Sequence, residues 1–290
     1  MHTDGARSYG EPAGVMLARA LADAGRYVFT IDDAAAAAPP GTSRAHVRKL
    51  LKALSDAGWL VRLRRGLYAG TGGLPGGVDL PPLVVATALV TPSAISHWSA
   101  LAHHGLTDQV PVVVTASTPR KVVTPGMRHR AQAAERSTWT AADIRIRYIT
   151  IVEERYRLGL ESVWLDERFR VPMTDRERTV LDLFAMPRIF GGVATGLRVL
   201  ERAADGLDVE RLVGYGVRYG VVAVAKRLGW ALAATGVDEG ALAPLLALPA
   251  SSAVPLDPGR PRRGRHDRRW TVIENLGGGP AGRADDEARD

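Results

Sequence analysis

Seven cationic side chains lie between residues 41 and 70, and their chemistry is that of phosphate binding. They share this stretch with a single acid, Asp56, so its formal charge is +6, while the whole chain carries only +7. So much surplus charge on one short stretch is typical of a surface that binds a nucleic acid backbone. The candidate contact residues are Ser43, Arg44, His46, Arg48, Lys49, Lys52, Arg62, Arg64 and Arg65.

A helix followed by a β-hairpin must position these side chains. Ser43 is a good N-cap, and the next apolar residues recur at the spacing of one helix face, at Val47, Leu50, Leu51 and Leu54. Gly58 ends this helix, apolar residues and arginines then alternate as in a half-buried strand, and Arg65 with Gly66 can form the turn. The sequence therefore predicts a recognition helix for the major groove of duplex DNA and an arginine-tipped wing for phosphates or the adjacent minor groove.

The preceding residues complete a winged helix-turn-helix. Apolar spacing predicts a helix over 17–24 and a short strand over 27–29, and Thr30 is placed to cap a helix over 30–38 that stops at Pro39. We therefore expect a winged helix-turn-helix DNA-binding domain at residues 11–70. The alternative is a winged helix used only for protein contact, because all but four of the 38 basic residues are arginine and the cluster partly reflects that composition.

A histidine- and serine-rich segment, SAISHWSALAHHGL, is where a metal site or a nucleophile would be sought. His97 and His104 are seven residues apart, about 10 Å along a helix, which is too far for two ligands of one zinc ion. The adjacent His103 and His104 diverge by about 100° on a helix. The segment is better explained as a packed helix that ends at Gly105.

The segment from Thr174 to Phe184 carries acids that could serve catalysis. Thr174 and Glu177 fit a capping box, in which Thr174 caps a helix and Glu177 reaches back to it. Arg178 and Asp182 are spaced to pair on the surface of the same helix, for about 0.3–0.5 kcal/mol. We therefore expect these acids to be structural.

The chain lacks the residues that common enzymes of nucleotide chemistry need. It has no cysteine, no lysine after a glycine and no Asp-x-Asp pair. These gaps exclude thiolate zinc sites, cysteine nucleophiles, a phosphate-binding P-loop and the simplest two-metal carboxylate site. We expect no catalytic residues, no metal and no cofactor, so a nuclease or transferase is the weakest function class.

The rest of the chain predicts a second, larger domain. A glycine-rich linker is expected at 71–79, a domain of mixed helices and strands at 80–276 and a disordered tail at 277–290, so the fold class is α+β. Helices are expected over 83–89, 92–104, 174–185, 192–204 and 208–234, the last with a break allowed at Gly220. Strands are expected over 110–117, 144–152 and 162–167.

Residues 80–107 contain no Asp, Glu, Lys or Arg, which invites a transmembrane interpretation. Prolines and histidines interrupt the run, so a buried pair of helices explains it better. The first residues lack the apolar core of a signal peptide. We expect a cytoplasmic protein without membrane contact.

A second basic cluster, GRPRRGRHDRRW, has six arginines, at positions 260, 262, 263, 265, 268 and 269, and one acid, Asp267. Its proline and glycine content favours a loop or an arm over a helix. A solvated loop would explain the cluster, and an auxiliary phosphate-contacting arm is the functional alternative.

Together these segments resemble the AbiEi family, the antitoxins of type IV toxin-antitoxin systems. The winged helix is similar through G-W-L-V-R-L-R-R-G-L-Y at 58–68. The second domain is similar through S-x-x-S-A-L-x-x-H-G-L at 96–106, T-x-x-E-R-T-V-L-D at 174–182 and W-T-V-I-E-N at 270–275. The likeness spans most of residues 11–276 and depends on the order of the four motifs, since none is specific alone. The linker, the arginines at 260–269 and the acidic tail depart from the family pattern.

The resemblance implies an antitoxin that binds duplex DNA in its own promoter, represses its operon and counteracts a cognate nucleotidyltransferase toxin, with or without direct contact. The competing class is a ligand-responsive winged-helix transcription factor without a toxin partner. A neighbouring reading frame with a nucleotidyltransferase pattern would distinguish the two.

Overall fold

The computed structural model describes residues 12–73, 77, 79–128, 138–203 and 206–277. Part of the expected linker at 71–79 and all but the first residue of the expected tail at 277–290 lie outside the described residues. Helices and strands are mixed in the pattern of an α+β protein, as predicted. Within the described ranges, no helix combines the length and the apolar content that a membrane crossing needs.

The chain divides into two compact units that interleave along the sequence. The N-terminal unit comprises Met1–Thr91, Val123–Ile146 and Trp164–Arg170. The C-terminal unit comprises Pro92–Val122, Arg147–Val163 and Val171–Asp290. The N-terminal unit thus includes later segments as well as the winged helix.

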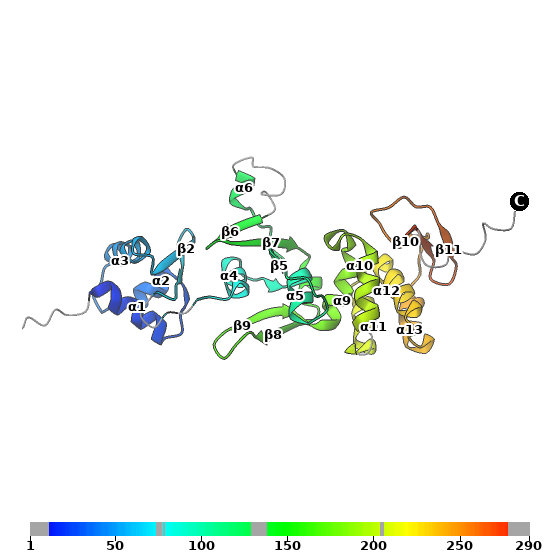
Figure 1. Cartoon of the computed structure of the whole chain (residues 1–290), viewed down its shortest axis with the longest axis horizontal. Helices are drawn as coiled ribbons and strands as arrows, with labels where there is room; N and C mark the ends of the chain where they lie inside the picture. Colours follow the sequence, from blue (N-terminus) through cyan, green and yellow to red (C-terminus); the bar gives the residue numbers. More distant parts are fainter. Residues whose placement is uncertain (1–11, 74–76, 78, 129–137, 204–205, 278–290) are drawn as a thin grey trace, which may run out of the picture. The chain divides into compact units, whose positions relative to one another are not determined.

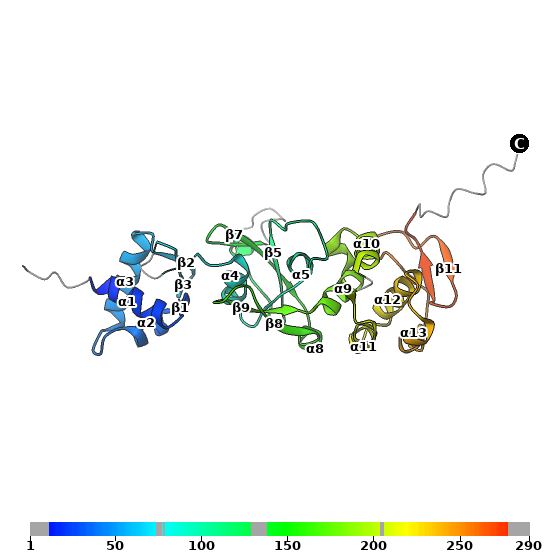
Figure 2. The same cartoon turned by 60° about the horizontal axis from the view of Figure 1, so that its bottom comes forward.

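The winged helix-turn-helix has the predicted order of elements (Figure 1). These are α1 (Ala13–Asp23), β1 (Val28–Thr30), α2 (Ile31–Ala37), α3 (Arg44–Asp56), β2 (Leu60–Arg64) and β3 (Leu67–Gly70). The three strands form an antiparallel sheet in the order β1-β3-β2, as Figure 2 shows. Its core contains Leu17, Phe29, Val47 and Leu51, each at most 2% exposed.

Local chemistry accounts for the start of α2. The Thr30 hydroxyl accepts from the backbone N–H of Asp33 at 3.2 Å, and the Asp33 carboxylate accepts from the backbone N–H of Thr30 at 2.8 Å. This reciprocal pair is a capping box, which satisfies two backbone donors at once. The backbone and side-chain hydrogen bonds from Thr30 lower the pKa of Asp33.

The N-terminal unit continues with α4 (Pro82–Leu89), α6 (Pro125–Arg128), β6 (Thr138–Ala141) and the beginning of β7 (Ile144–Thr150). Ala142 and Asp143 form the β6–β7 turn and have φ values of 50° and 61°. Strand β2 of the wing contacts both α4 and β6. The wing is therefore supported on one side by elements that follow it in the chain.

A mixed six-stranded sheet has the order β6-β7-β5-β4-β9-β8. Its remaining strands are β4 (Ala94–Ile95), β5 (Val114–Thr118), β8 (Leu160–Trp164) and β9 (Arg170–Thr174), and the short helices α5 (His97–His103) and α8 (Glu153–Tyr156) belong to the same region. Strand β4 pairs antiparallel with β5 and parallel with β9. The predicted helix over 92–104 is wrong in its first part, because Ala94 and Ile95 satisfy their backbone groups in this sheet. The strand predicted over 110–117 is also shorter, since it begins only at Val114.

A bundle of helices follows the sheet. Its members are α9 (Arg176–Ala185), the 3₁₀ turn η1 (Pro187–Phe190), α10 (Val193–Ala203), α11 (Val209–Arg218), α12 (Val222–Ala234) and α13 (Glu239–Leu246). The predicted break in the long helical pattern is confirmed, because Gly220 has a φ of 71° between α11 and α12. The bundle buries one continuous apolar core that includes Leu181, Phe184, Leu228 and Leu245.

A small three-stranded sheet covers this bundle. Strand β12 (Val272–Glu274) lies between β10 (Val254–Pro255) and β11 (Arg265–Asp267). The Trp270 ring packs so closely on α12 that a Cβ at Gly229 would lie 2.1 Å from it. The second basic cluster is thus part loop and part strand, with β11 inside it.

Candidate nucleic-acid interface

Helix α3 and the wing expose every predicted contact residue. The Ser43 side chain caps α3 by accepting from the backbone N–H of His46 at 3.2 Å. Val47, Leu51 and Leu54 enter the domain core, which leaves the polar positions of the helix in solvent. The exposed set is Ser43, Arg44, His46, Arg48, Lys49, Lys52, Arg62, Arg64 and Arg65.

Two cations of α3 already have acidic partners. Arg44 contacts Asp32 of α2 at 2.7 Å, and Lys52 contacts Asp56 at 2.5 Å. All four side chains are more than half exposed, so each pair contributes only about 0–1 kcal/mol and can exchange its acid for a phosphate. Within the described residues, Arg48 and Lys49 have no ion-pair or hydrogen-bond partner for their side chains. The centre of the helix therefore carries its most available positive charge.

The three arginines of the wing differ in their contacts with the protein. Gly66 takes a φ of 78° and allows the tight turn between β2 and β3. The Arg64 Nε donates to the carbonyl of Leu89, at the end of α4, at 3.2 Å, and the Arg62 Nε donates to the carbonyl of Arg64 at 3.4 Å. Arg65 at the tip has no such contact within the described residues. Arg64 thus fastens the wing to α4, and Arg62 and Arg65 are better placed for a ligand.

The side of the wing that contacts α4 is acidic. A cavity of about 280 Å³ lies there, between the wing, the start of α4 and the β6–β7 turn. Its charged lining residues are Asp79 and Asp143, and the others include Val61, Ala69 and Val85. Carboxylates repel phosphate, so a nucleic acid would contact the wing at its tip and outer side.

The histidines of the second motif do not form a metal site. His97 is fully buried, and its Nδ1 lies 2.7 Å from the Ser96 hydroxyl, while His104 Nε2 lies 2.8 Å from the carbonyl of Thr174. Burial lowers the pKa of His97, against a smaller opposing effect of Asp182. Within the described ranges, no cluster of His, Cys, Asp and Glu could hold a metal ion. These side chains therefore join the helix to the sheet.

The expected surface pair of α9 is completely buried. Arg178 and Asp182 are both 0% exposed, with Nε and Oδ1 3.0 Å apart. The Arg178 Nη1 also donates to the carbonyls of Leu158, at 2.7 Å, and Arg155. The prediction of an exposed pair is wrong because tertiary packing, which helix spacing does not contain, covers this face of α9.

The predicted capping box of α9 is wrong by one residue. Thr174 is the last residue of β9, and Asp175 is the N-cap, accepting from the backbone N–H of Arg178 at 2.7 Å. Glu177 instead accepts from the backbone N–H of Asp208 at 3.0 Å. The other Asp175 oxygen accepts from the Tyr215 hydroxyl at 2.6 Å, and burial followed by this bond raises the pKa of Tyr215 to about 12. These acids are structural, as expected, but through long-range contacts.

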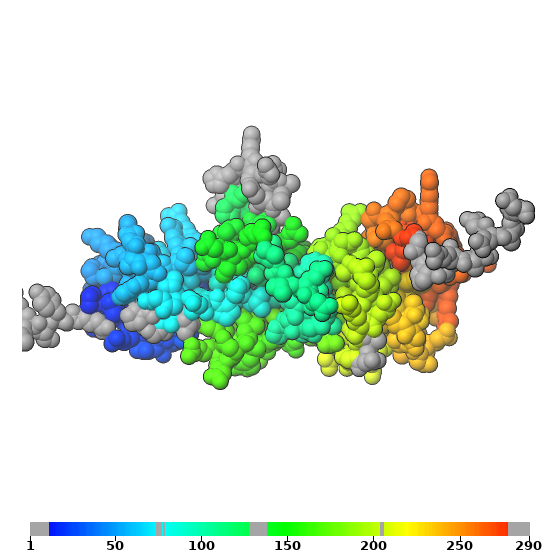
Figure 3. All heavy atoms as spheres, in the orientation of Figure 1, coloured from blue at the N-terminus to red at the C-terminus, as the bar shows by residue number. Residues whose placement is uncertain are grey.

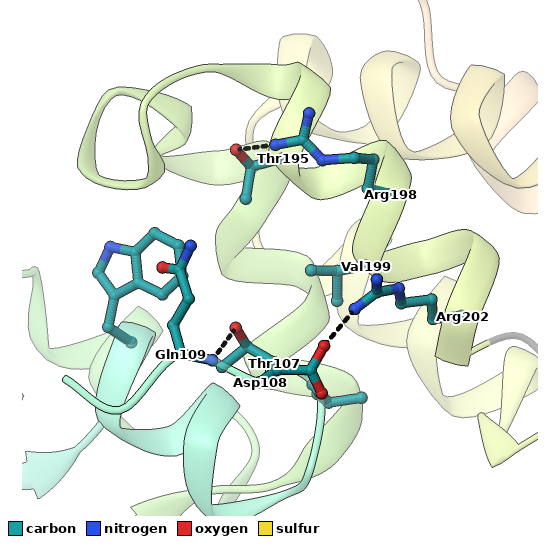
Figure 4. A pocket seen from close by; sticks show the side chains of 9 residues that line it. Thr107, Asp108, Gln109, Thr195, Arg198, Val199 and Arg202 are labelled. Carbon is teal, nitrogen blue, oxygen red and sulfur yellow. Dashed lines mark hydrogen bonds and ion pairs between the residues drawn. The ribbon is translucent and has the colours of Figure 1, made fainter.

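An open groove of about 240 Å³ lies on the C-terminal unit (Figure 4). Figure 4 shows residues 107–109, from the loop after α5, facing Thr195, Arg198 and Arg202 of α10. Arg202 pairs with Asp108 at 2.9 Å, and Arg198 donates to the Thr195 hydroxyl at 3.3 Å. The ion pair between Arg202 and Asp108 therefore joins the two sides of the groove.

The fold and the exposed cations define a winged helix-turn-helix protein. Residues 16–69 match the model of a family described as "Transcriptional regulator, AbiEi antitoxin". The resemblance to the AbiEi family is confirmed for this region, which spans nearly the whole winged helix and marks it as that of an antitoxin-type transcriptional regulator.

A solved structure extends the comparison to most of the chain. The crystal structure of the RV2827C protein from Mycobacterium tuberculosis superimposes with a TM-score of 0.59. The match covers 90% of this chain and 91% of that chain at 17% sequence identity, so it establishes a shared fold. No curated protein matches the chain.

Sequence reasoning missed the partners that determine how free Arg44 and Arg64 are to bind a ligand. Asp32 and the Leu89 carbonyl are far from Arg44 and Arg64 in sequence, and only the tertiary fold brings them within bonding distance. The sequence shows Asp32 in the first turn of α2, but the spacing of residues 32 and 44 does not indicate that Asp32 contacts Arg44.

Proposed function

We propose that this chain is an antitoxin and transcriptional repressor that binds operator DNA in its own promoter. The observation that carries the proposal is the coincidence of the family match at 16–69 with an exposed, cation-bearing helix and wing. A protein that acts on its own promoter works in the cytoplasm with that DNA. The chain itself is proposed to bind and not to catalyse.

In the proposed complex, α3 enters the major groove. Arg44, His46 and Arg48 lie near its N-terminal end, where recognition helices contact base edges. Arg62 and Arg65 of the wing bind phosphates or enter the adjacent minor groove, and Lys49 and Lys52 add further phosphate contacts. Sequence choice then depends mainly on the helix, and the wing sets affinity and register.

The salt dependence of DNA binding tests the electrostatic part of this model. Four cations, Arg48, Lys49, Arg62 and Arg65, have no acidic partner within the described part of the chain and, unlike Arg64, are not fastened to α4. If each neutralises one phosphate, they contribute about −3.6 to the slope of log affinity against log salt, or about 150-fold weaker binding at 200 than at 50 mM salt. A flat salt response would refute the model.

Paired variants test the division of labour between helix and wing. Arg48→Ala should weaken binding to the promoter fragment more than to random duplex of equal length, whereas Arg62→Ala with Arg65→Ala should weaken both alike. Arg168→Ala removes an exposed arginine of the same unit that lies outside α3 and the wing, and serves as the charge control. Equal losses for all three variants would contradict a specific interface.

The second half of the proposal is that the chain counteracts a nucleotidyltransferase toxin encoded by a neighbouring gene. It is supported by the family description and by the order of motifs that extends into the C-terminal unit. Co-expression with the adjacent gene should restore growth that the toxin alone prevents. Repression without growth rescue, together with release of DNA by a small effector, would instead favour a ligand-responsive transcription factor.

A further inference from the structure

The groove of about 240 Å³ on the C-terminal unit lies between two walls that the core holds in place. One wall is the loop after α5, residues 107–109, and the other is the exposed side of α10. Both α5 and α10 pack on α9 and η1, so the protein core sets the distance between the walls. Figure 3 shows the blue-green surface of the segment near residue 107 beside the yellow-green surface of α10. A ligand would therefore meet a preformed site, which lowers the entropy lost on binding.

The Trp98 ring is the aromatic part of the groove lining. Its Nε1 donates to the carbonyl of Ile189 at 3.1 Å, and its ring packs on Phe190 with the ring centroids 5.5 Å apart. Leu106 and Val199, which are 5% and 7% exposed, complete the apolar part of the lining. This part of the groove suits a flat ring, because a fixed aromatic side chain provides a stacking surface without losing freedom of its own.

Arg198 and Arg202 give the α10 side of the groove a positive charge. They are four residues apart on one face of the helix, so about 6 Å separates them along the helix axis. Arg198 donates to the Thr195 hydroxyl at 3.3 Å, and within the described residues it has no acidic partner. Figure 4 shows Arg198 at one end of the groove and the pair of Arg202 with Asp108 at the other. Two guanidinium groups at this spacing can bind neighbouring phosphates of one di- or triphosphate chain.

Asp108 offsets only part of this positive charge. Two arginines and one aspartate leave the lining with a net charge of 2 − 1 = +1. The side chains of Arg202 and Asp108 are 70% and 91% exposed in their ion pair. Ion pairs as exposed as this one contribute little free energy, so a phosphate can displace the carboxylate from Arg202.

The size and composition of the groove favour a small molecule over a macromolecule. Six of the nine lining residues are polar or charged, whereas the centre of a protein interface is apolar. The exposed Val110 and Val112 of the same loop are not among the lining residues. The volume is close to the lower end of small-molecule sites, about 300 Å³. Because the ion pair of Arg202 joins the two sides, the groove offers no continuous channel for a nucleic acid strand.

We infer that this groove binds a nucleoside triphosphate, whose base stacks on Trp98 and whose phosphates contact Arg198 and Arg202. Thr195 and Gln109 supply further hydrogen-bonding groups at the edge of the site. Because every base has an aromatic face, the identity of the base affects affinity less than its presence does. The inference goes beyond the proposed function, because the groove belongs to the C-terminal unit and the proposed DNA contacts belong to the winged helix.

Isothermal titration calorimetry of the full-length chain tests the inference with ATP, GTP, CTP and UTP, each added to about 1 mM. All four should bind, and inorganic triphosphate and the uncharged nucleosides should bind about 10-fold more weakly. The Arg198→Ala, Arg202→Ala double variant should bind nucleotide at least 10-fold more weakly, because it loses charge-assisted hydrogen bonds. Asp108→Asn should bind up to about 5-fold more tightly, because Arg202 then has no competing carboxylate.

Arg263→Ala with Arg268→Ala is the matched control, because it removes two exposed arginines of the same unit that lie outside the groove. Arg48→Ala with Arg65→Ala is the control for nucleotide attracted to the winged helix. Both controls should keep the wild-type affinity. The inference is overturned if the wild-type chain binds no nucleotide, if inorganic triphosphate binds equally well, or if either control loses as much affinity as the groove variant. A chain that binds the promoter duplex but no nucleotide refutes this inference alone and leaves the proposed function standing.

Discussion

The buried pair on α9 gives a sharp prediction about stability. Asp182→Ala removes the carboxylate that compensates a guanidinium with no exposed surface. Arg178 cannot leave for solvent, because its Nη1 is also bound to the carbonyls of Leu158 and Arg155. Loss of one member of a buried ion pair typically costs about 3–5 kcal/mol, whereas an exposed pair at the same spacing contributes about 0.3–0.5 kcal/mol. The free energy of unfolding of the C-terminal unit should therefore fall by several kcal/mol.

Replacing both partners separates the cost of an unpaired charge from the value of the pair. The Nη2 of Arg178 and the Oδ2 of Asp182 are buried without a hydrogen-bond partner, so the pair is incompletely satisfied within the described structure. Arg178→Met with Asp182→Leu should therefore destabilise less than Asp182→Ala, because it leaves no unpaired charge; its remaining cost comes from the carbonyls of Leu158 and Arg155, which lose their Arg178 donor.

Urea unfolding, followed by the fluorescence of the six tryptophans of the full chain, measures both variants by linear extrapolation of the transition that the substitutions shift. A loss below about 1 kcal/mol for Asp182→Ala, or an equally large loss for the double variant, would refute the reasoning. DNA binding under native conditions should be unchanged, because neither residue belongs to the proposed interface.

Three further predictions follow from the same contacts. Burial lowers the pKa of His97 below 6.5, so on acidification the unfolded chain takes up a proton at this histidine before the folded chain does. The free energy of unfolding should therefore fall by up to about 1.4 kcal/mol between pH 7.5 and 5.5, and His97→Asn should remove that dependence. Gly214→Ala, with open space around it in α11, should stabilise by about 0.5–1 kcal/mol, whereas Gly229→Ala in α12, against the Trp270 ring, should destabilise by about 1–3 kcal/mol or more. Asp32→Asn should release Arg44 and tighten DNA binding, and it should steepen the salt slope by about 0.9 if the released guanidinium binds one phosphate beside the base edges.

Each of these has an internal control. Asn suits the φ of 56° at position 97 and can keep the bond to Ser96, so a wild-type pH profile in His97→Asn would exclude His97 as the titrating group. The two glycine variants make the same chemical change in neighbouring helices, and effects of one sign would contradict the packing argument. An unchanged salt slope for Asp32→Asn would mean that Arg44 does not reach the DNA backbone.

Much of the winged helix could be predicted from sequence because its determinants are local. Ser43 and Thr30 cap helices within three residues, and Gly66 forms the wing turn between adjacent strands. The exposure of all nine predicted contact residues also follows from helix and strand periodicity. The same periodicity could not show that Arg64 is bound to the carbonyl of Leu89, because that contact spans 25 residues.

The C-terminal unit was harder to predict because its short elements depend on distant partners. Ala94 and Ile95 form a strand only by pairing with β5 and β9. The apolar segment 92–104, which local spacing predicts as one helix, is therefore divided into β4 and α5. Local spacing also could not show that Asp175, and not Thr174, is the N-cap of α9, because Asp175 is held in place by a hydrogen bond from Tyr215, 40 residues later in the chain.

By itself, the sequence determined where helices begin and end in the winged helix, where the positive charge gathers and which chemistries are missing, since these depend on residue type and short spacing. The tertiary structure decided which partner each cation has: Arg44 has the exposed Asp32, Arg64 has a carbonyl of α4, and Arg178 has a buried carboxylate. The physical reason is that the ability of a charged side chain to bind a ligand depends on its solvent exposure and on its partners, and burial and long-range pairing are properties of the folded chain.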